Sequence, residues 1–194
     1  MGGVIGFAKK TDCVMDLFFG IDYHSHLGTK RGGMCVLEKD GFNRAIHNIS
    51  NAPFRTKFGD ELEDMEGNMG IGAISDSDPQ PLTVYSRHGD FAITTVGRIN
   101  NKEELIAELL KDRPTQFMSM SHGNINSTEL VAAIVSTHSS KDKPSASIVE
   151  MILEVSVDKI LAFTPLPRPS ASTITVEFSS CSTTSTWSPQ SSSP

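Results

Sequence analysis

The pattern of hydrophobic and polar positions predicts strands in the first half of the chain. Short apolar runs there are bounded by Gly, Asn and Asp, which favours β-strands. We expect strands at Gly3–Ala8, Met34–Leu37, Gly70–Ile74, Leu82–Ser86 and Phe91–Val96. The last two flank a short segment with a Gly–Asp pair, which is typical of a hairpin turn, so we expect them to pair antiparallel.

Two amphipathic helices are predicted after these strands. Asn101 and Glu104 have the spacing of a capping box, and Pro114 ends the first helix. Asn126 and Glu129 repeat that spacing at the start of the second helix. Each helix carries an apolar stripe, made of Leu105, Ile106, Leu109 and Leu110 in the first and of Leu130, Val131, Ile134 and Val135 in the second.

The length of 194 residues fits one domain with a tail. We place the domain at 1–145, a helix and linker at 146–164, and a Ser/Thr/Pro-rich tail at 165–194. Residues 169–194 hold ten Ser and five Thr with one acid and no base, so this segment buries too little apolar surface to offset its ordering entropy. We expect the tail to be disordered, or to be a truncated or out-of-frame end.

Charge and cysteine content exclude several classes of function. The formal net charge is -6, with acids and bases interleaved, which argues against nucleic-acid and membrane partners. Three cysteines without CxxC spacing form neither a disulfide framework nor a zinc motif and fit a reducing cytoplasm. The first residues show no basic segment followed by a long apolar run, so we expect neither secretion nor membrane insertion. No glycine-rich phosphate loop occurs, and we predict no cofactor.

Three further groups of side chains carry candidate chemistry. Asp22, His24 and His26 would share one face of a strand as a metal site, but no fourth ligand is evident, so a structural or loop role is favoured and no metal is predicted. Cys13 and Cys35 lack an identifiable neighbouring base, which favours unreactive thiols. A donor-rich cluster would bind a phosphate or a partner domain, or form a solvated face, and comprises Asn43, Arg44, His47, Asn48, Asn51, Arg55 and Lys57.

The first six residues carry a resemblance to a known family. Met1-Gly2-Gly3-Val4-Ile5-Gly6 is similar to the opening Met-Cys-Gly-(Val/Ile)-x-Gly of class II glutamine amidotransferases, N-terminal nucleophile hydrolases that include amidophosphoribosyltransferase. In that family, removal of Met leaves a Cys whose thiolate attacks glutamine while its own α-amine serves as base. Gly2 stands at the position of this nucleophile and has no side chain with which to attack.

Three later stretches resemble the family in the same order, and together with the opening they cover roughly residues 1 to 135. The segment from Gly72 to Asp78, followed by Gln80 and Pro81, is similar to Gly-His-x-Arg-Tyr-Ser-Thr with its Gln-Pro. The segment from Thr95 to Asn101 is similar to His-Asn-Gly-Asn-Leu-x-Asn, and the segment from Asn126 to Glu129 to Ser-Asp-Thr-Glu. Each stretch also fits an ordinary turn or helix cap, so the order along the chain carries the resemblance.

The resemblance assigns a role to four more positions. Ser75 replaces the arginine that pairs with the α-carboxylate of glutamine, and Ser127 replaces the aspartate that binds its α-amino group. Val96 replaces the asparagine of the oxyanion hole, where Gly97 still offers a backbone N–H. Because these groups act as one site, we expect hydrolysis of glutamine to be lost.

The resemblance implies an α+β fold, the four-layer αββα sandwich of the N-terminal nucleophile hydrolases, with a disordered C-terminal tail. It also implies an amidotransferase-like domain related to purine biosynthesis, deficient as a glutaminase and without the phosphoribosyltransferase domain that follows it in the family. The alternative is a non-catalytic regulatory or scaffold domain that binds a partner or a small metabolite. A third hypothesis is an enzyme that uses Cys13 or the His24/His26 pair. Glutamine, a phosphoribosyltransferase domain or subunit, and a second copy of the chain are the partners considered.

Overall fold

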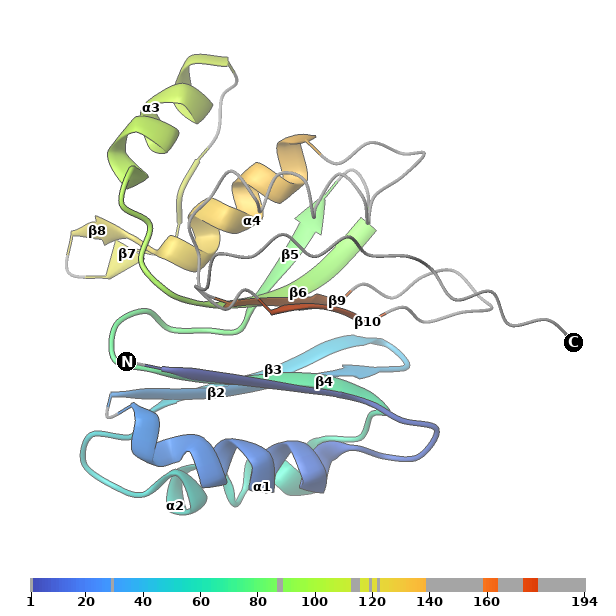
Figure 1. Cartoon of the computed structure of the whole chain (residues 1–194). Coiled ribbons are helices and arrows are strands. Elements are labelled where there is room, and N and C mark those ends of the chain that lie inside the picture. The colour runs from blue at the N-terminus through green and yellow to red at the C-terminus, as the bar shows by residue number, and fades with distance from the viewer. Residues whose placement is uncertain are drawn as a thin grey trace, which may run out of the picture.

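Two four-stranded antiparallel sheets form the centre of the part of the chain that the structure describes (Figure 1). This computed structural model describes residues 2–28, 30–86, 89–112, 116–118, 120–121, 123–138, 159–163 and 173–177. The first sheet has the order β1-β4-β2-β3, formed by Gly3–Ala8, Met69–Ser75, Arg31–Glu38 and Gly41–Asn48. The second has the order β10-β9-β6-β5, formed by Thr173–Glu177, Lys159–Phe163, Gly89–Val96 and Leu82–Ser86.

Helices cover the outer faces of both sheets. In Figure 1, α1 (Val14–His24) and α2 (Phe54–Phe58) lie against the first sheet, on the side away from the second sheet. The helices α3 (Lys102–Asp112) and α4 (Ser127–His138) lie on the opposite side of the second sheet. Short elements complete the chain: the 3₁₀ helices η1 (Ser25–Leu27) and η2 (Glu61–Asp64), and the hairpin of β7 (Met120–Ser121) and β8 (Asn124–Ile125).

Apolar side chains at helical spacing fix α1 to the first sheet. Val14, Leu17, Phe18 and Ile21 recur at i, i+3, i+4 and i+7, and all four are buried. A second apolar cluster joins α4 to β6, and a third lies between the sheets, where Ala92 of β6 packs with residues of the first sheet. The sheets are therefore held face to face by side chains from both.

The structure confirms the antiparallel sheets and the main elements predicted from the sequence. β1 and β5 have the predicted bounds, β2, β4 and β6 are longer than predicted by one to three residues at their ends, and α3 and α4 begin directly after Asn101 and Asn126. The predicted hairpin is the antiparallel pair of β5 and β6. Helix α1 was not predicted, because Met15, Phe19 and Tyr23 are apolar on its exposed face and blur the periodicity.

The C-terminal part differs from what the composition suggested. Strand β9 lies where a helix and linker were expected, and it pairs with β6 through Thr94 opposite Leu161. Strand β10 lies within the segment expected to be disordered, and it pairs with β9 through Thr175 opposite Leu161. Its sequence, Thr-Ile-Thr-Val-Glu, is rich in β-branched residues, a local preference for strand that the serine-rich composition hid. Ser179 onward lies outside the described residues.

Candidate functional site

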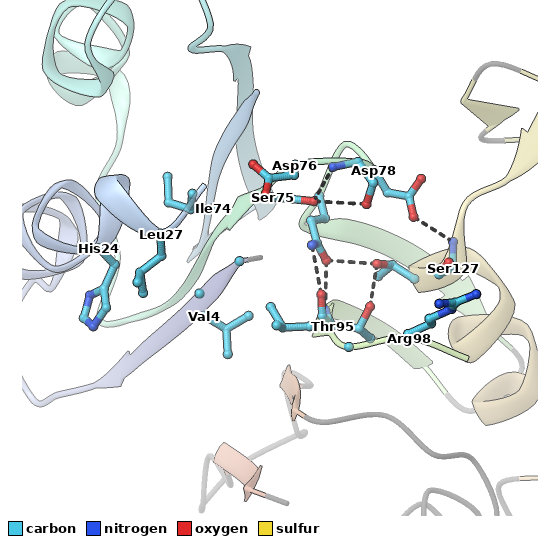
Figure 2. Close-up of a pocket in the computed structure, with 17 residues that line it drawn as sticks. Val4, His24, Leu27, Ile74, Ser75, Asp76, Asp78, Thr95, Arg98 and Ser127 are labelled. Carbon is cyan, nitrogen blue, oxygen red and sulfur yellow. Dashed lines mark hydrogen bonds between the residues drawn. The ribbon is translucent and has the colours of Figure 1, made fainter. Parts of the chain in front are cut away.

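A cleft opens where several elements begin or end at the same edge of the molecule. It has a volume of about 630 Å³ and lies beside the start of β1, the end of β4, the end of β6 and the start of α4 (Figure 2). Its lining consists of Gly2, Gly3, Val4, His24, Leu27, Ile74, Ser75, Asp76, Ser77, Asp78, Gln80, Thr95, Val96, Gly97, Arg98, Ser127 and Thr128. A volume of this size is typical of sites for small molecules.

The five positions singled out in the sequence all line this cleft: Gly2, Ser75, Val96, Gly97 and Ser127. They come from segments far apart in the chain, and the antiparallel pairing brings the start of β1 beside the end of β4, with Gly3 opposite Ile74. The structure therefore brings the predicted positions together. The roles assigned to them by resemblance stay predictions.

The backbone at Gly2 leaves no room for a side chain. A Cβ placed on Gly2 would lie 2.6 Å from the carbonyl oxygen of Ile74, well inside normal contact, and 3.6 Å from Cγ2 of Val96. The oxygen belongs to the backbone of β4, so it cannot turn aside as a flexible side chain would. In this geometry the position at the head of β1 fits glycine, and a larger residue would require the end of β1 or β4 to shift.

Strand β6 ends at the cleft in a turn that also requires glycine. Gly97 has a φ of +142°, in the region that other residues rarely adopt. The turn carries the chain out of β6 between Val96, which is half-buried, and Arg98, which is exposed. Figure 2 shows the Arg98 side chain beside the start of α4, on the same side of the cleft as Ser127.

The loop after β4 brings hydroxyl and carboxylate groups to the cleft. The Oγ of Ser75 accepts a hydrogen bond from the backbone N–H of Ser77 at 3.2 Å. Oδ2 of Asp78 accepts from the backbone N–H of Ser127 at 3.1 Å, at the positive end of α4. A carboxylate therefore lies close to Ser127, although position 127 itself carries no charge.

Gln80 joins this loop to β6 and α4 through a buried network. Its Nε2 donates to the carbonyl oxygen of Thr95 at 2.9 Å. Its Oε1 accepts from Thr94 Oγ1 at 2.8 Å, from Thr95 N at 2.9 Å and from Thr128 Oγ1 at 2.9 Å. The Thr95 and Thr128 hydroxyls are 2.7 Å apart, and since the Thr128 proton goes to Gln80, Thr95 is the donor between them.

Asn126 fixes the start of α4, as its cap position predicted. Its Oδ1 accepts from the backbone N–H of Thr128 at 2.8 Å, and its Nδ2 donates to the carbonyl oxygen of Pro79 at 3.0 Å. The Nζ of Lys102 donates to Ser127 Oγ at 3.2 Å and also to the carbonyl oxygen of Ile125. The start of α4 is thus tied to the loop after β4 and to α3.

The strand geometry assumed for Asp22, His24 and His26 is wrong, because these residues belong to α1 and η1. His24 Nδ1 donates to the carbonyl oxygen of Gly20 at 2.7 Å, and His26 Nδ1 donates to that of Tyr23 at 2.8 Å. Asp22 Oδ2 accepts from Arg55 Nε at 2.7 Å. Among the described residues, no three His, Cys, Asp or Glu side chains are grouped so as to hold a metal ion.

The donor-rich cluster predicted at residues 43–57 is divided between β3, α2 and the segment that joins them. Arg44 donates to the carbonyl oxygen of Pro81 at 3.3 Å, whereas His47 forms an ion pair with Glu61 of η2. Asn43 Nδ2 donates to Glu38 Oε1 at 2.7 Å. These donors bind groups of the same chain and do not converge on one site.

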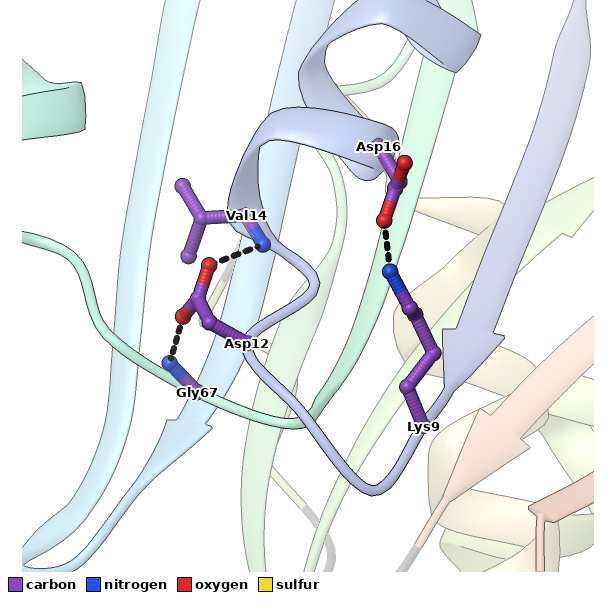
Figure 3. Close-up of polar contacts among 5 residues, drawn as sticks. All are labelled: Lys9, Asp12, Val14, Asp16 and Gly67. Carbon is purple, nitrogen blue, oxygen red and sulfur yellow. Dashed lines mark hydrogen bonds and ion pairs between the residues drawn. The ribbon is translucent and has the colours of Figure 1, made fainter.

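A second hollow lies at the opposite end of the first sheet, where β1 ends and β4 begins. Its volume is about 770 Å³, and five carboxylates and two lysines are among the residues that line it. Asp12 is occupied there, since its Oδ1 accepts from Val14 N at 3.0 Å and its Oδ2 from Gly67 N at 2.8 Å (Figure 3). Lys9 and Asp16 form an ion pair nearby, which raises the pKa of Lys9. These contacts hold the start of α1 to the loop before β4.

Fold and cleft together define a class of protein: two antiparallel sheets between helices, with a cleft of mixed polar and apolar lining at the N-terminal end of the first strand. The fold is similar to that of glutamine phosphoribosylpyrophosphate amidotransferase from B. subtilis, solved in complex with ADP and GMP, with a TM-score of 0.69 and 18% identity. A structure of the allosteric regulatory enzyme of purine biosynthesis matches with a TM-score of 0.68 and 18% identity. In both cases 84% of this chain is covered, and it spans 35% of the other chain.

These likenesses establish the fold. No protein-family model matches the sequence, and no curated protein matches it. No helix in the described part of the chain is long and apolar enough to cross a membrane.

Proposed function

We propose that this chain is a glutamine amidotransferase-like domain, related to amidophosphoribosyltransferases of purine biosynthesis, that does not hydrolyse glutamine. On this proposal its layers are the four-layer αββα sandwich of the N-terminal nucleophile hydrolases, and Gly2 stands where those enzymes carry their nucleophilic Cys. The similarity of fold to two enzymes of that kind supports the relationship.

The observation that carries the loss of activity is the geometry at Gly2. The residue lines the cleft, it has no side chain, and the place of a Cβ is taken by the carbonyl oxygen of Ile74 at 2.6 Å. Removing the nucleophile removes the covalent route to hydrolysis. The same geometry argues that the nucleophile is not merely missing, because β1 and β4 pack in the space it would need.

The other cleft positions support the same proposal. Ser75 and Val96 supply neither a cation for an α-carboxylate nor an amide donor for an oxyanion, and deleting one oxyanion donor typically costs about 10²–10³ in rate. Ser127 carries no charge for an α-amino group. Although Asp78 lies next to Ser127 and Gly97 keeps its backbone N–H at the cleft, the side chains at positions 2, 75 and 96 supply no nucleophile, cation or amide donor.

A retained binding role is the second candidate, and the buried network favours it. Gln80 is 4% exposed, and each polar atom of its side chain is bonded to β6 or α4, so buried hydrogen bonds fix the loop that lines the cleft to both elements. We propose that the cleft serves as a non-hydrolytic binding site for a small metabolite. We also propose that the chain associates with a phosphoribosyltransferase domain or with a second copy of itself. Its proposed location is the cytoplasm.

An ammonia-release assay on the unaltered full chain with glutamine tests the proposal. We expect release at the rate of the buffer blank over a wide range of glutamine concentrations. The control is the same assay with a known glutamine amidotransferase in the same buffer. Turnover that is proportional to the concentration of this chain would contradict the proposal.

A further inference from the structure

The charged residues that line the cleft are unequal in number and in burial. Asp76 and Asp78 are both half-buried, whereas Arg98 is exposed; His24, the other basic residue of the lining, is half-buried and is counted as neutral in the formal charge. A partly desolvated charge interacts more strongly with a ligand than a solvated one does, because less water screens it. The interior of the cleft is therefore expected to favour positive charge.

We propose that the cleft binds a small organic cation, a primary amine or diamine on a short apolar chain. The inference rests on the proposed function only in taking the cleft as a binding site that does not cleave its ligand. It names the chemical class of that ligand, which the fold alone does not supply.

Hydrogen-bond acceptors on one wall of the cleft would bind the ammonium group of the ligand. Asp76 and Asp78 come from the loop after β4, together with the hydroxyls of Ser75 and Ser77. Figure 2 shows Asp76 beside Ser75 and Asp78 reaching toward Ser127, so the two carboxylates flank the loop side of the cleft. An ammonium group has three donors and no acceptor, and it matches a wall of carboxylate and hydroxyl oxygens.

Apolar side chains of the cleft would pack against the carbon chain of the ligand. Val4, Leu27 and Ile74 lie on the side of β1 and η1, as Figure 2 shows, and Val96 lines the cleft from the end of β6. Burying methylene groups against these side chains adds affinity without requiring polar partners.

A free carboxylate would be disfavoured in the same place. It would meet Asp76 and Asp78, and like charges at short range repel. Arg98 lies at the exposed end of the cleft, and Lys102, whose Nζ contacts Ser127 Oγ at 3.2 Å, is not among the lining residues. The cleft should therefore discriminate an amine from an amino acid or a dicarboxylate of equal length.

Isothermal titration calorimetry on the full chain tests the proposal with three ligands of equal length: 1,5-diaminopentane, 1,5-pentanediol and glutarate. We expect measurable binding for the diamine, none for the diol or the dicarboxylate, and weakening of the diamine as salt is raised from about 20 to about 300 mM. Absence of binding by the diamine would overturn the proposal. So would displacement of the bound diamine by Mg²⁺ at equal concentration, because it would indicate attraction of any cation.

Matched variants locate the site. Asp76→Asn and Asp78→Asn keep the shape and an acceptor oxygen but remove the charge, and each should weaken diamine binding about 10- to 100-fold. Asp40→Asn, at the second hollow, is the control and should leave binding unchanged. Weakening by Asp40→Asn with none from the two cleft variants would place the amine at the other end of the sheet and overturn the assignment.

Two cleft variants are used so that the test does not depend on the folding of either one. Each tests the same prediction, and circular dichroism reports whether each has folded. If neither folds, the unaltered chain still decides the matter through the diamine, diol and dicarboxylate comparison. Failure here is distinguishable from failure of the proposed function: ammonia release from glutamine would contradict the latter, whatever the result with amines.

Discussion

Gly2 shows how closely the backbone of β4 approaches the head of β1. Because a Cβ at this position would lie 2.6 Å from the Ile74 carbonyl oxygen, we expect Gly2→Ala to lower the free energy of unfolding by about 1–3 kcal/mol. Gly59→Ala is the matched control: its Cβ would lie 3.6 Å from the nearest atom, and its backbone is helical. It should be neutral or stabilising by up to about 1 kcal/mol. Urea denaturation of both variants measures this, and equal effects would show that the strand end moves aside.

Cys13 and Cys35 are expected to be inert thiols. Burial, reinforced by the Asp12 carboxylate, raises the pKa of Cys13 to about 11, and burial raises the pKa of Cys35 to about 12. At pH 8 few thiolates would form in the folded protein, so iodoacetamide should modify neither residue until urea is added. Peptide mass spectrometry measures the modification. Rapid alkylation of Cys13 in the folded chain would revive the hypothesis that it acts as a nucleophile.

The same shifts predict the direction of a pH effect. The folded state holds both thiol protons more tightly than the unfolded state, whose thiols titrate near the ordinary value. Their contribution to stability is therefore complete below about pH 8.5 and is lost as pH rises toward 11 and 12.

At the level of single residues, the sequence predicted which positions meet but not what surrounds them. Gly2, Ser75, Val96, Gly97 and Ser127 were found because four short motifs occur in a family's order, and all line the cleft. Asp78 and Gln80 lie inside one of those motifs, yet their contacts reach Ser127 and Thr128. Contacts of that separation leave no periodic signal in a single sequence.

Gln80 links three parts of the fold, namely the loop after β4, strand β6 and helix α4. Replacing it by Leu leaves the Thr94 and Thr128 hydroxyls and the Thr95 N–H without their buried acceptor. We expect Gln80→Leu to reduce the free energy of unfolding by about 2–4 kcal/mol. The exposed Gln116→Leu should change it by less than about 0.5 kcal/mol. Chemical denaturation distinguishes the two, and similar effects would contradict a structural role for the network.

Elements with a local sequence signal, such as a capping residue or an apolar face, were predictable, and elements without such a signal were not. Helices α3 and α4 follow residues at cap positions, and the Asn126 side chain bonds the first turn of α4 as expected. Strand β3 alternates Asn43, Ala45 and His47 on one face with Arg44, Ile46 and Asn48 on the other, so neither face reads as apolar. It is held by its partner β2 rather than by its own pattern.

At the scale of the whole molecule, sheet pairing explains both the cleft and the C-terminal strands. The start of β1, the ends of β4 and β6, and the start of α4 meet only because the two sheets stack with these ends together (Figure 1). Strand β9 extends the second sheet beyond β6. Such a pairing depends on a partner distant in the chain, which is why composition alone suggested a disordered tail.

On the proposed function, a single substitution in this chain should not produce hydrolysis of glutamine. Gly2→Cys would supply a thiol beside its own α-amine, but its Cβ would lie 2.6 Å from the Ile74 carbonyl oxygen, and on the proposal Ser75 and Ser127 provide no charged anchor for glutamine. Two lost charged contacts at about 1.5–3 kcal/mol each would weaken glutamine binding by two to four powers of ten.

Ammonia release from glutamine, measured across a series of variants, tests the central claim most directly. The series comprises the unaltered chain, Gly2→Cys, and Gly2→Cys combined with Ser75→Arg, Val96→Asn and Ser127→Asp. We predict background rates for the first two, with activity confined, if it returns, to the combined variant. Clear turnover by the unaltered chain would contradict the account, and turnover by Gly2→Cys alone would show that neither the Ile74 carbonyl nor the missing anchors limit the site.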